Sequence, residues 1–437
     1  MRAALGLWWG LQRREAAHDR RPTLLAVLAF AVSTTALLVS LGGTHAFVDR
    51  AAVAPPGDEY APIYVVLALV ACALLVVPIL TLGGVAARLG VARRHARLAT
   101  LRLAGATSRQ VGLMTLAECA AQAFAGAILG ALGYALALAP LSLLAFQGRR
   151  LGVDELWLGL PLVAAVVAGV VLLSVASGVG GLLRVVVGPL GVAARTTPVR
   201  LSAVRVLVVG CVVLAWFVVG QLTQQVGMAV TLGVLAAVVA TINVLGPYVV
   251  MLSGLAVARL ARGPETLLAA RRIVDDPRST WRSVSALGLG VALAALSSVG
   301  TVIAGDAGAD PAGAVLGADI ATGSLVALVI VSVVAATSTG VVQAARVIDQ
   351  GPQYRALALA GAPIPFLHRA RLREVTIPLG ATIVLGSVLP LLVLVPFADL
   401  AGIGLLVRTV VAIAAAAALT VAALAASRPL VREAVRL

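Results

Sequence analysis

The sequence lacks lysine altogether, and only 12% of its 437 residues are charged and 4% aromatic. A soluble globular domain has about 25% charged residues, so this composition excludes an ordinary soluble enzyme. It also excludes a disordered chain, which combines low hydrophobicity with high net charge. Without lysine there is no phosphate-binding loop of the Gly-x-x-x-x-Gly-Lys-Ser/Thr type, and any ATP hydrolysis must come from another polypeptide.

Cysteine and histidine are scarce as well. Cys72, Cys119 and Cys211 lie within or at the start of apolar runs and lack Cys-x-x-Cys spacing, which argues against a disulfide framework and a zinc site. The four histidines are scattered and form no metal-binding pattern: His18, His45, His95 and His368. No nucleophile–base pattern is present, so the sequence predicts no catalytic residue, no metal site and no cofactor in this chain.

Hydrophobic residues make up 61% of the chain, and the mean hydropathy is +1.06. A transmembrane helix needs ~20 consecutive apolar residues. Ten runs of roughly this kind occur: Leu24–Thr44, Pro62–Ala87, Val111–Leu136, Leu158–Leu183, Val206–Gln221, Met228–Ala258, Val284–Ile303, Ile320–Ala345, Val375–Val395 and Ile403–Ala426. They are continuous rather than alternating, which favours helices over barrel strands. We therefore expect an all-α polytopic membrane protein.

The distribution of arginine predicts the orientation of these spans. With the N-terminus inside, 29 of the 33 arginines fall on the cytoplasmic side, as the positive-inside rule requires. The exceptions are Arg50, Arg149, Arg150 and Arg408. Both termini are then cytoplasmic, and the net charge of +15 indicates orientation rather than nucleic-acid binding.

Glycine and proline within the runs allow two interpretations each. Gly126, Gly130 and Gly133 follow a small-residue spacing that suits close helix packing, either inside the chain or between two copies. The prolines are either tolerated by packed neighbours or act as hinges: Pro78, Pro161, Pro247, Pro378 and Pro390.

The chain contains an internal repeat. The segment 98–106, Leu-Ala-Thr-Leu-Arg-Leu-Ala-Gly-Ala, is similar to the segment 354–362, Tyr-Arg-Ala-Leu-Ala-Leu-Ala-Gly-Ala, 256 residues later. The same interval takes Glu118 to Glu374. The sequence thus predicts a parallel duplication with a first block over 1–199, a connecting pair of spans over 200–262 and a second block over 263–437.

Each block begins with a basic amphipathic stretch, Gly6–Arg21 in the first and Glu265–Arg282 in the second. Trp8, Trp9 and Trp281 lie in these stretches, and indole rings favour the headgroup level of a membrane. We expect a helix in the inner membrane interface at each position.

The loop between the second and third runs resembles the core signature of the FtsX-like permease domain, found in MacB-type and bacitracin-exporter-type ABC transporters. The matching residues are Leu-Arg-Leu-Ala-Gly-Ala-Thr over 101–107, followed by Glu118 at the start of the next span. The second copy, 357–362 with Glu374, matches more weakly, because Pro363 and Pro365 stand where Thr107 and Arg109 would be.

This resemblance implies a permease subunit in a bacterial cytoplasmic membrane, partnered by an ABC-type ATPase with two copies per permease chain. ATP and Mg²⁺ would be bound by that ATPase. The loops Arg94–Arg109 and Gly351–Arg373 would dock on it, and Gly105 and Gly361 would allow the left-handed turn that ends each loop helix. The implied coupling residues are Arg94, Arg97, Arg102, Gly105, Ala106, Thr107, Arg109, Tyr354, Arg355, Gly361, Ala362 and Arg369. The alternative is that the arginines only anchor the loops to anionic lipid.

Glu118 and Glu374 are candidate relay carboxylates. A carboxylate at the end of a span is costly unless it is solvated or paired. Each therefore either forms a salt bridge with a nearby arginine or contacts the element that transmits ATPase motion. Proton coupling is a third, less favoured interpretation, because no chain of carboxylates crosses the membrane in the sequence.

The implied function is export, or extraction from the membrane, of an amphipathic antimicrobial peptide, drug or lipid, with a role in peptide-antibiotic resistance. The external loops 45–61 and 304–319 are too short to form a domain, so substrate would enter from the membrane or a lateral cleft. The alternatives are an ion-driven secondary transporter and a non-transporting regulator that relays ATPase motion.

Overall fold

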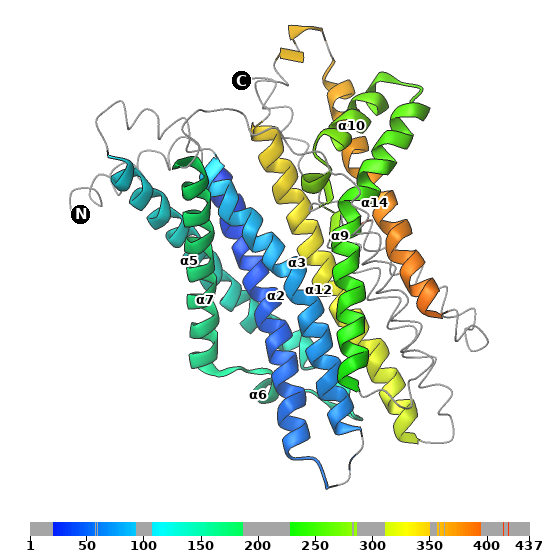
Figure 1. The fold of residues 1–437 in the computed structure, drawn as a ribbon. Helices are drawn as coiled ribbons and strands as arrows, with labels where there is room; N and C mark the ends of the chain where they lie inside the picture. The colour runs from blue at the N-terminus through cyan, green and yellow to red at the C-terminus, as the bar shows by residue number, and fades with distance from the viewer. Residues whose placement is uncertain are drawn as a thin grey trace.

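A computed structural model describes residues 21–56, 58, 60–92, 107–186, 228–281, 284–285, 311–349, 356–357, 359–361 and 363–394, with isolated helical residues at 414 and 418. Within these ranges the chain is a bundle of long helices (Figure 1). The only strands there are two residues each, β1 (Ala145–Phe146) and β2 (Arg149–Arg150).

The first half of the bundle contains α2 (Arg21–Ala52), α3 (Ala61–Ala92), α5 (Ser108–Leu141), the short α6 (Val153–Leu156) and α7 (Gly159–Val186). Helix α2 lies between α3 and α5 and packs along both. Each long helix coincides with a predicted apolar run. Helix formation follows because a backbone in hydrocarbon must satisfy its own hydrogen bonds.

The second half contains α9 (Met228–Leu260), α10 (Pro264–Asp275), α12 (Pro311–Asp349) and α14 (Ile364–Leu394). Helix α12 packs against α3 and α2 of the first half, whereas α10 packs against α9 and α14. Helix α14 begins 256 residues after α5 begins, which is the interval of the sequence repeat.

Five stretches of the described chain are long and apolar enough to cross a membrane: Thr23–Ala52, Ala61–Gly84, Gly112–Leu141, Val153–Val179 and Gly313–Val342. The predicted class, an all-α chain with several potential spans, is confirmed. Helices α9 and α14 cover the predicted sixth and ninth runs. The fifth run, all but residues 414 and 418 of the tenth, all but two residues of the seventh, and all but Arg21 of the first amphipathic stretch lie outside the described residues. The total of ten spans therefore stays a prediction.

Glycine sets how closely α2 and α5 approach. A Cβ atom on Gly126 would lie 2.5 Å from Phe30 Cβ, and one on Gly130 would lie 2.6 Å from Thr34 Cβ. A Cβ on Gly133 would meet Thr35 Oγ1 at 2.6 Å. The small-residue spacing in this span therefore faces a helix of the same chain, which confirms internal packing.

The predicted second amphipathic stretch is a helix, but its apolar face contacts protein. Ala269, Ala270 and Ile273 of α10 are buried. Trp281, expected at the headgroup level, is only 4% exposed and packs on α9 at Gly246. A side chain at Gly246 would overlap the indole ring. Because glycine has no side chain, the indole ring of Trp281 can pack directly on α9.

The prolines in the described helices do not end them. Helix α3 continues through Pro78 and α9 through Pro247. Pro78 and Pro378 are buried, in agreement with the reading that packed neighbours tolerate them.

Candidate functional site

A cavity of about 350 Å³ lies between α2, α3, α12 and the segment that follows α5. Most of its wall is apolar, with Leu75, Ile330 and Phe146 among the lining side chains. Protein interiors rarely leave voids much larger than a water molecule, whereas ligand sites start at about 300 Å³. Its size and lining are therefore those of a binding site for an apolar group.

The cavity is elongated along the helices. On α3 its lining extends from Tyr64 to Leu75, and on α12 from Asp319 to Ile330. At 1.5 Å of rise per residue this is roughly 16 Å, about half of the ~30 Å hydrocarbon core of a bilayer. The polar groups Tyr64 and Asp319 lie at one end of it, and the deeper lining is mostly aliphatic.

A β-hairpin covers the polar end of the cavity. Strands β1 and β2 pair antiparallel, with Phe146 opposite Arg149. The two turn residues, Gln147 and Gly148, have positive φ angles of 56° and 73°, as a two-residue hairpin turn of type I′ requires. The Phe146 ring packs edge-on against Phe47, which stacks on Tyr64. We call this end of the bundle the hairpin end.

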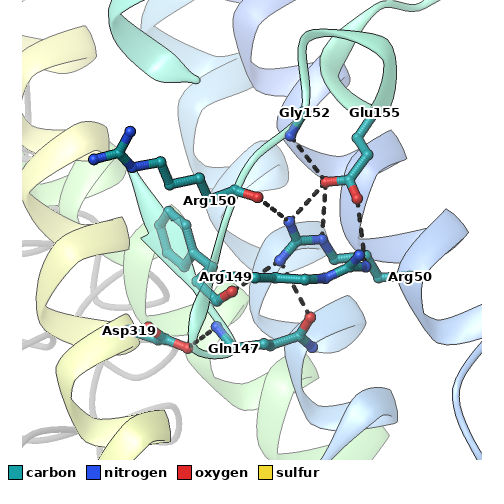
Figure 2. Close-up of polar contacts among 8 residues, drawn as sticks. Arg50, Gln147, Arg149, Arg150, Gly152, Glu155 and Asp319 are labelled. Atoms are coloured by element: carbon teal, nitrogen blue, oxygen red, sulfur yellow. Dashed lines mark hydrogen bonds and ion pairs between the residues drawn. The ribbon is translucent and has the colours of Figure 1, made fainter. Parts of the chain in front are cut away.

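Arg50, the third-last residue of α2, fixes the hairpin in place (Figure 2). Its guanidinium donates to Glu155 Oε2 at 3.0 Å and 2.7 Å. It also donates to the carbonyl oxygens of Phe146 and Arg150, each at 2.9 Å. Arg50 is only 4% exposed, so one buried cation holds the end of α2, both strands and α6 together.

Glu155 is the matching acceptor. Its Oε2 also accepts from the Gly152 backbone N–H at 3.2 Å, and its Oε1 lies 3.3 Å from the Arg149 guanidinium. Because it receives several donors, the carboxylate keeps most of its polar interactions although it is largely removed from water.

Asp319, near the start of α12, connects the hairpin to the other half of the bundle. Its Oδ2 accepts from Tyr64 Oη and from the Gln147 backbone N–H, both at 2.6 Å (Figure 2 draws the second). The residue is 7% exposed and lines the cavity. We call Asp319, Tyr64 and Gln147 the latch, because they join α12, α3 and the hairpin at the cavity's polar end.

The opposite end of the bundle, which we call the α10 end, holds a second set of ion pairs. Glu265 of α10 contacts Arg369 at 3.0 Å and Arg373 at 3.1 Å, both on α14. Arg272 of α10 lies 3.5 Å from Glu374, which is 5% exposed. We call these five residues the clamp, since they hold α10 against α14.

The clamp accounts for two of the predicted site residues. Glu374 forms the salt bridge that was one of its two main interpretations. Arg369, predicted to contact an ATPase, binds Glu265 within the chain while its side chain stays 59% exposed. Glu118 accepts a hydrogen bond of 3.3 Å from Gln122 one turn later in α5.

The starts of α5 and α14 include the described parts of the two predicted coupling loops. Thr107 caps α5: its hydroxyl accepts from the Gln110 N–H, and the Gln110 side chain accepts from the Thr107 N–H. This is the reciprocal capping box. Gly361 has φ +91°, the left-handed conformation predicted for it, and lies three residues before α14 begins.

The remaining predicted coupling residues are not placed. Arg109 is the second residue of α5, and its side chain is not described. The others lie outside the described residues: Arg94, Arg97, Arg102, Gly105, Ala106, Tyr354, Arg355 and Ala362. Within the described ranges, no group of three or more histidine, cysteine or acidic residues could hold a metal ion.

Sequence reasoning missed Arg50, Glu155 and Asp319. A signal was present, since Arg50 is one of only four arginines on the predicted outer side, where a cation next to hydrocarbon needs a partner. The partner itself could not be named, because Glu155 is 105 residues away.

Comparisons of the chain with family models, with curated proteins and with solved structures find no match. The function therefore has to be argued from the cavity, the latch, the clamp and the motif-bearing helix starts.

Proposed function

We propose that this chain is the membrane subunit of an ABC transporter of the FtsX-like, mechanotransmission type. A separate ATPase, two copies per chain, would supply ATP hydrolysis. The permease would use it to export an amphipathic molecule or extract it from the membrane of a bacterial cell. The hairpin end would face outward and the α10 end the cytoplasm.

The observation on which this proposal rests most is the interval of 256 residues. It relates the two Leu-Ala-Gly-Ala motifs, and it also relates the first residues of α5 and α14. Each of the two basic loops leads into a long helix, and both helices begin at the same end of the bundle. A dimeric ATPase could bind both loops at once, one with each subunit. The interval also supports the two blocks, 1–199 and 263–437.

The clamp supports the transmission of force. A loop that an ATPase pushes can move a span only if the parts near the loop are firmly connected. Glu265 and Glu374 supply that connection between α10 and the first turns of α14. In this proposal α10 and α14 move as one body.

The cavity supports an amphipathic substrate. Its lining is apolar over about half the depth of a bilayer and polar at one end. A molecule with a hydrocarbon part and a polar group could enter it from the surrounding membrane, as the short external loops also suggest.

Asp319 favours one alternative, a proton-driven secondary transporter, because it is a buried carboxylate in a transmembrane cavity. The two proposals predict different energy sources. A reconstituted ABC permease transports only with its ATPase and ATP, whereas a secondary transporter works without ATP and stops when the proton gradient is dissipated.

The direct test is to purify the chain together with the ATP-binding-cassette protein encoded next to its gene. The proposal predicts a stable complex in which ATPase turnover differs from that of the free ATPase. An ATPase that does not bind the chain, or whose turnover is indifferent to it, contradicts the proposal.

A further inference from the structure

We propose that the cavity is a binding site for cationic amphipaths, with the protonated amine at Asp319 and the hydrocarbon chain between α3 and α12. This inference deepens the proposed permease function, since such a molecule would be the transported substrate. Binding by the chain alone does not require the ATPase, so the two ideas can fail separately.

Two hydrogen bonds converge on one oxygen of Asp319. Tyr64 Oη and the Gln147 N–H both reach the same oxygen, Oδ2, at 2.6 Å. An oxygen that accepts from two donors at this short distance has the character of an ionised carboxylate. Both donors stabilise the carboxylate form of Asp319, and the proposal places the amine of the ligand against this carboxylate at the cavity's polar end.

Among the described residues, no ion pair joins the Asp319 carboxylate to a cationic side chain. All the ion pairs at the hairpin end involve other acids: Arg50 and Arg149 both bind Glu155, and His45 contacts Asp49. The hydrogen bonds from Tyr64 and Gln147 to Asp319 both reach Oδ2. A buried carboxylate without a counter-ion is costly, and a cationic ligand would remove that cost.

Behind the Asp319 carboxylate, the cavity extends along α3 and α12. From Asp319 the lining continues through Gly323, Ala327 and Ile330 on α12, and through Ala68 and Ala71 on α3. Small residues on facing helices line the cavity over roughly 16 Å along the helix axes, a length that suits an extended alkyl chain. A polar head at one end and an extended tail along the helices fit this geometry.

The location within the bilayer agrees with the same ligand. At the polar end, Tyr64 is the fourth residue of α3 and Asp319 the ninth residue of α12, so the amine would stay near the membrane surface. The tail would lie at the depth of the surrounding acyl chains. A single-chain amphipath could therefore enter sideways without inverting.

The test measures binding of radiolabelled dodecylammonium to the full chain in phosphatidylcholine nanodiscs, with empty nanodiscs subtracted. Dodecanol and dodecanoate, which have the same chain length and a neutral or negative head, are the comparators. We expect saturable binding of one dodecylammonium per chain, at least about tenfold tighter than dodecanol, with dodecanoate weakest.

Three variants locate the site. Asp319→Asn keeps the size of the side chain and should bring dodecylammonium binding down to that of dodecanol. Ala71→Phe fills the cavity and should weaken both ligands. Tyr64→Phe removes one latch hydrogen bond but keeps Asp319 and the cavity, so this variant should still prefer dodecylammonium to dodecanol. It tests the proposal independently if Asp319→Asn does not fold.

Asp154→Asn is the matched control, because Asp154 is an exposed carboxylate on α6 at the same end of the bundle. It should bind dodecylammonium as the unmodified chain does. Equal binding of all three head groups, a preference that survives Asp319→Asn, or loss of the preference in Asp154→Asn would each overturn the proposal. None of these results bears on whether the chain regulates an ATPase.

Discussion

Arg50 shows how a single buried charge can organise one end of a membrane protein. Its guanidinium replaces the water that the carbonyl oxygens of Phe146 and Arg150 would otherwise bind, and it neutralises Glu155. Arginine suits this role because its planar fork offers five donors in fixed directions. A lysine has three donors around one atom and could not reach all these acceptors.

Replacing Arg50 by alanine should destabilise the chain by about 3–5 kcal/mol, since it breaks a buried ion pair and leaves the carbonyl oxygens of Phe146 and Arg150 without this donor. Glu155 would keep only the Gly152 N–H and the exposed Arg149. Arg50→Lys should recover only part of this loss. The measurement is thermal or denaturant unfolding in detergent, followed by circular dichroism.

Arg149→Ala is the control for that prediction. Arg149 contacts the same carboxylate, but its side chain is 57% exposed, and an exposed pair contributes at most about 1 kcal/mol. If Arg149→Ala costs as much as Arg50→Ala, burial is not what makes Arg50 important.

At this scale the sequence indicates which residues are unusual but not what they contact. Arg50 stands out as an arginine on the predicted outer side, and Asp319 as an acid at the edge of an apolar run. Their partners, Glu155 and Gln147, are brought to them by the packing of α2, α6, α12 and the hairpin. No local pattern encodes those distances.

Among the elements, the contact between α2 and α5 depends on glycine. In a bilayer there is little hydrophobic force between helices, so close packing through small residues holds them together. Gly126, Gly130 and Gly133 let the backbone of α5 approach Phe30, Thr34 and Thr35. A Cβ at Gly126 or Gly130 would also lie within 2.8 Å of a backbone oxygen of α2, so a larger residue at either position must push the helices apart.

We predict that Gly126→Ala and Gly130→Ala each destabilise the bundle by about 1–3 kcal/mol, the usual cost of overpacking. Gly169→Ala, on α7, is the matched control because a Cβ there has no atom within 4 Å. It should be neutral or stabilise by up to about 1 kcal/mol through helix propensity. The measurement is thermal unfolding. Equal changes in stability at all three positions would show that the loss does not come from the contact between α2 and α5.

In the clamp between α10 and α14, we predict that replacing Glu374 costs more stability than replacing Glu265. Glu374 is buried beside Arg272, so Glu374→Gln removes a charge that faces a cation in a site with little water, which typically costs several kcal/mol. Glu265 binds two arginines that are substantially exposed, Arg369 and Arg373, so Glu265→Gln should cost about 1 kcal/mol.

Hydrogen exchange of the α10 backbone, residues 264–275, measures this order directly. Exchange should accelerate strongly in Glu374→Gln and slightly in Glu265→Gln, while the amides of α2 should not change. A larger effect of Glu265→Gln would mean that the exposed pairs, rather than the buried one, hold α10 in place.

Much at the element scale is predictable from sequence. Continuous apolar runs mark α2, α3, α5, α7, α9 and α12, because any such run must form a helix in hydrocarbon. The amphipathic pattern also predicts α10, but not what covers its apolar face. Membrane lipid and the α9–α14 surface are both apolar, so periodicity alone does not distinguish them, and Trp281 proves to pack on protein.

At the scale of the whole molecule, the two ends of the bundle are held together by different sets of polar contacts. The hairpin end is closed by Arg50, Glu155 and the latch, and the cavity begins beneath them. The α10 end contains the clamp and the starts of α5 and α14. Helix α5, which begins at the α10 end, packs on α2 and α3, and both of these form walls of the cavity. An ATPase that moves the start of α5 would therefore act on the cavity through α2 and α3, and this is how the proposed permease would couple hydrolysis to substrate movement.

The measurement that tests this account most directly is the turnover of the partner ATPase with charge-reversed permeases. Arg102 belongs to the first coupling motif, and Arg150 is an exposed arginine at the opposite end of the bundle. The account predicts that Arg102→Glu abolishes the effect of the permease on ATPase turnover, while Arg150→Glu leaves it intact. An ATPase that responds equally to the unmodified chain and to both variants would contradict it.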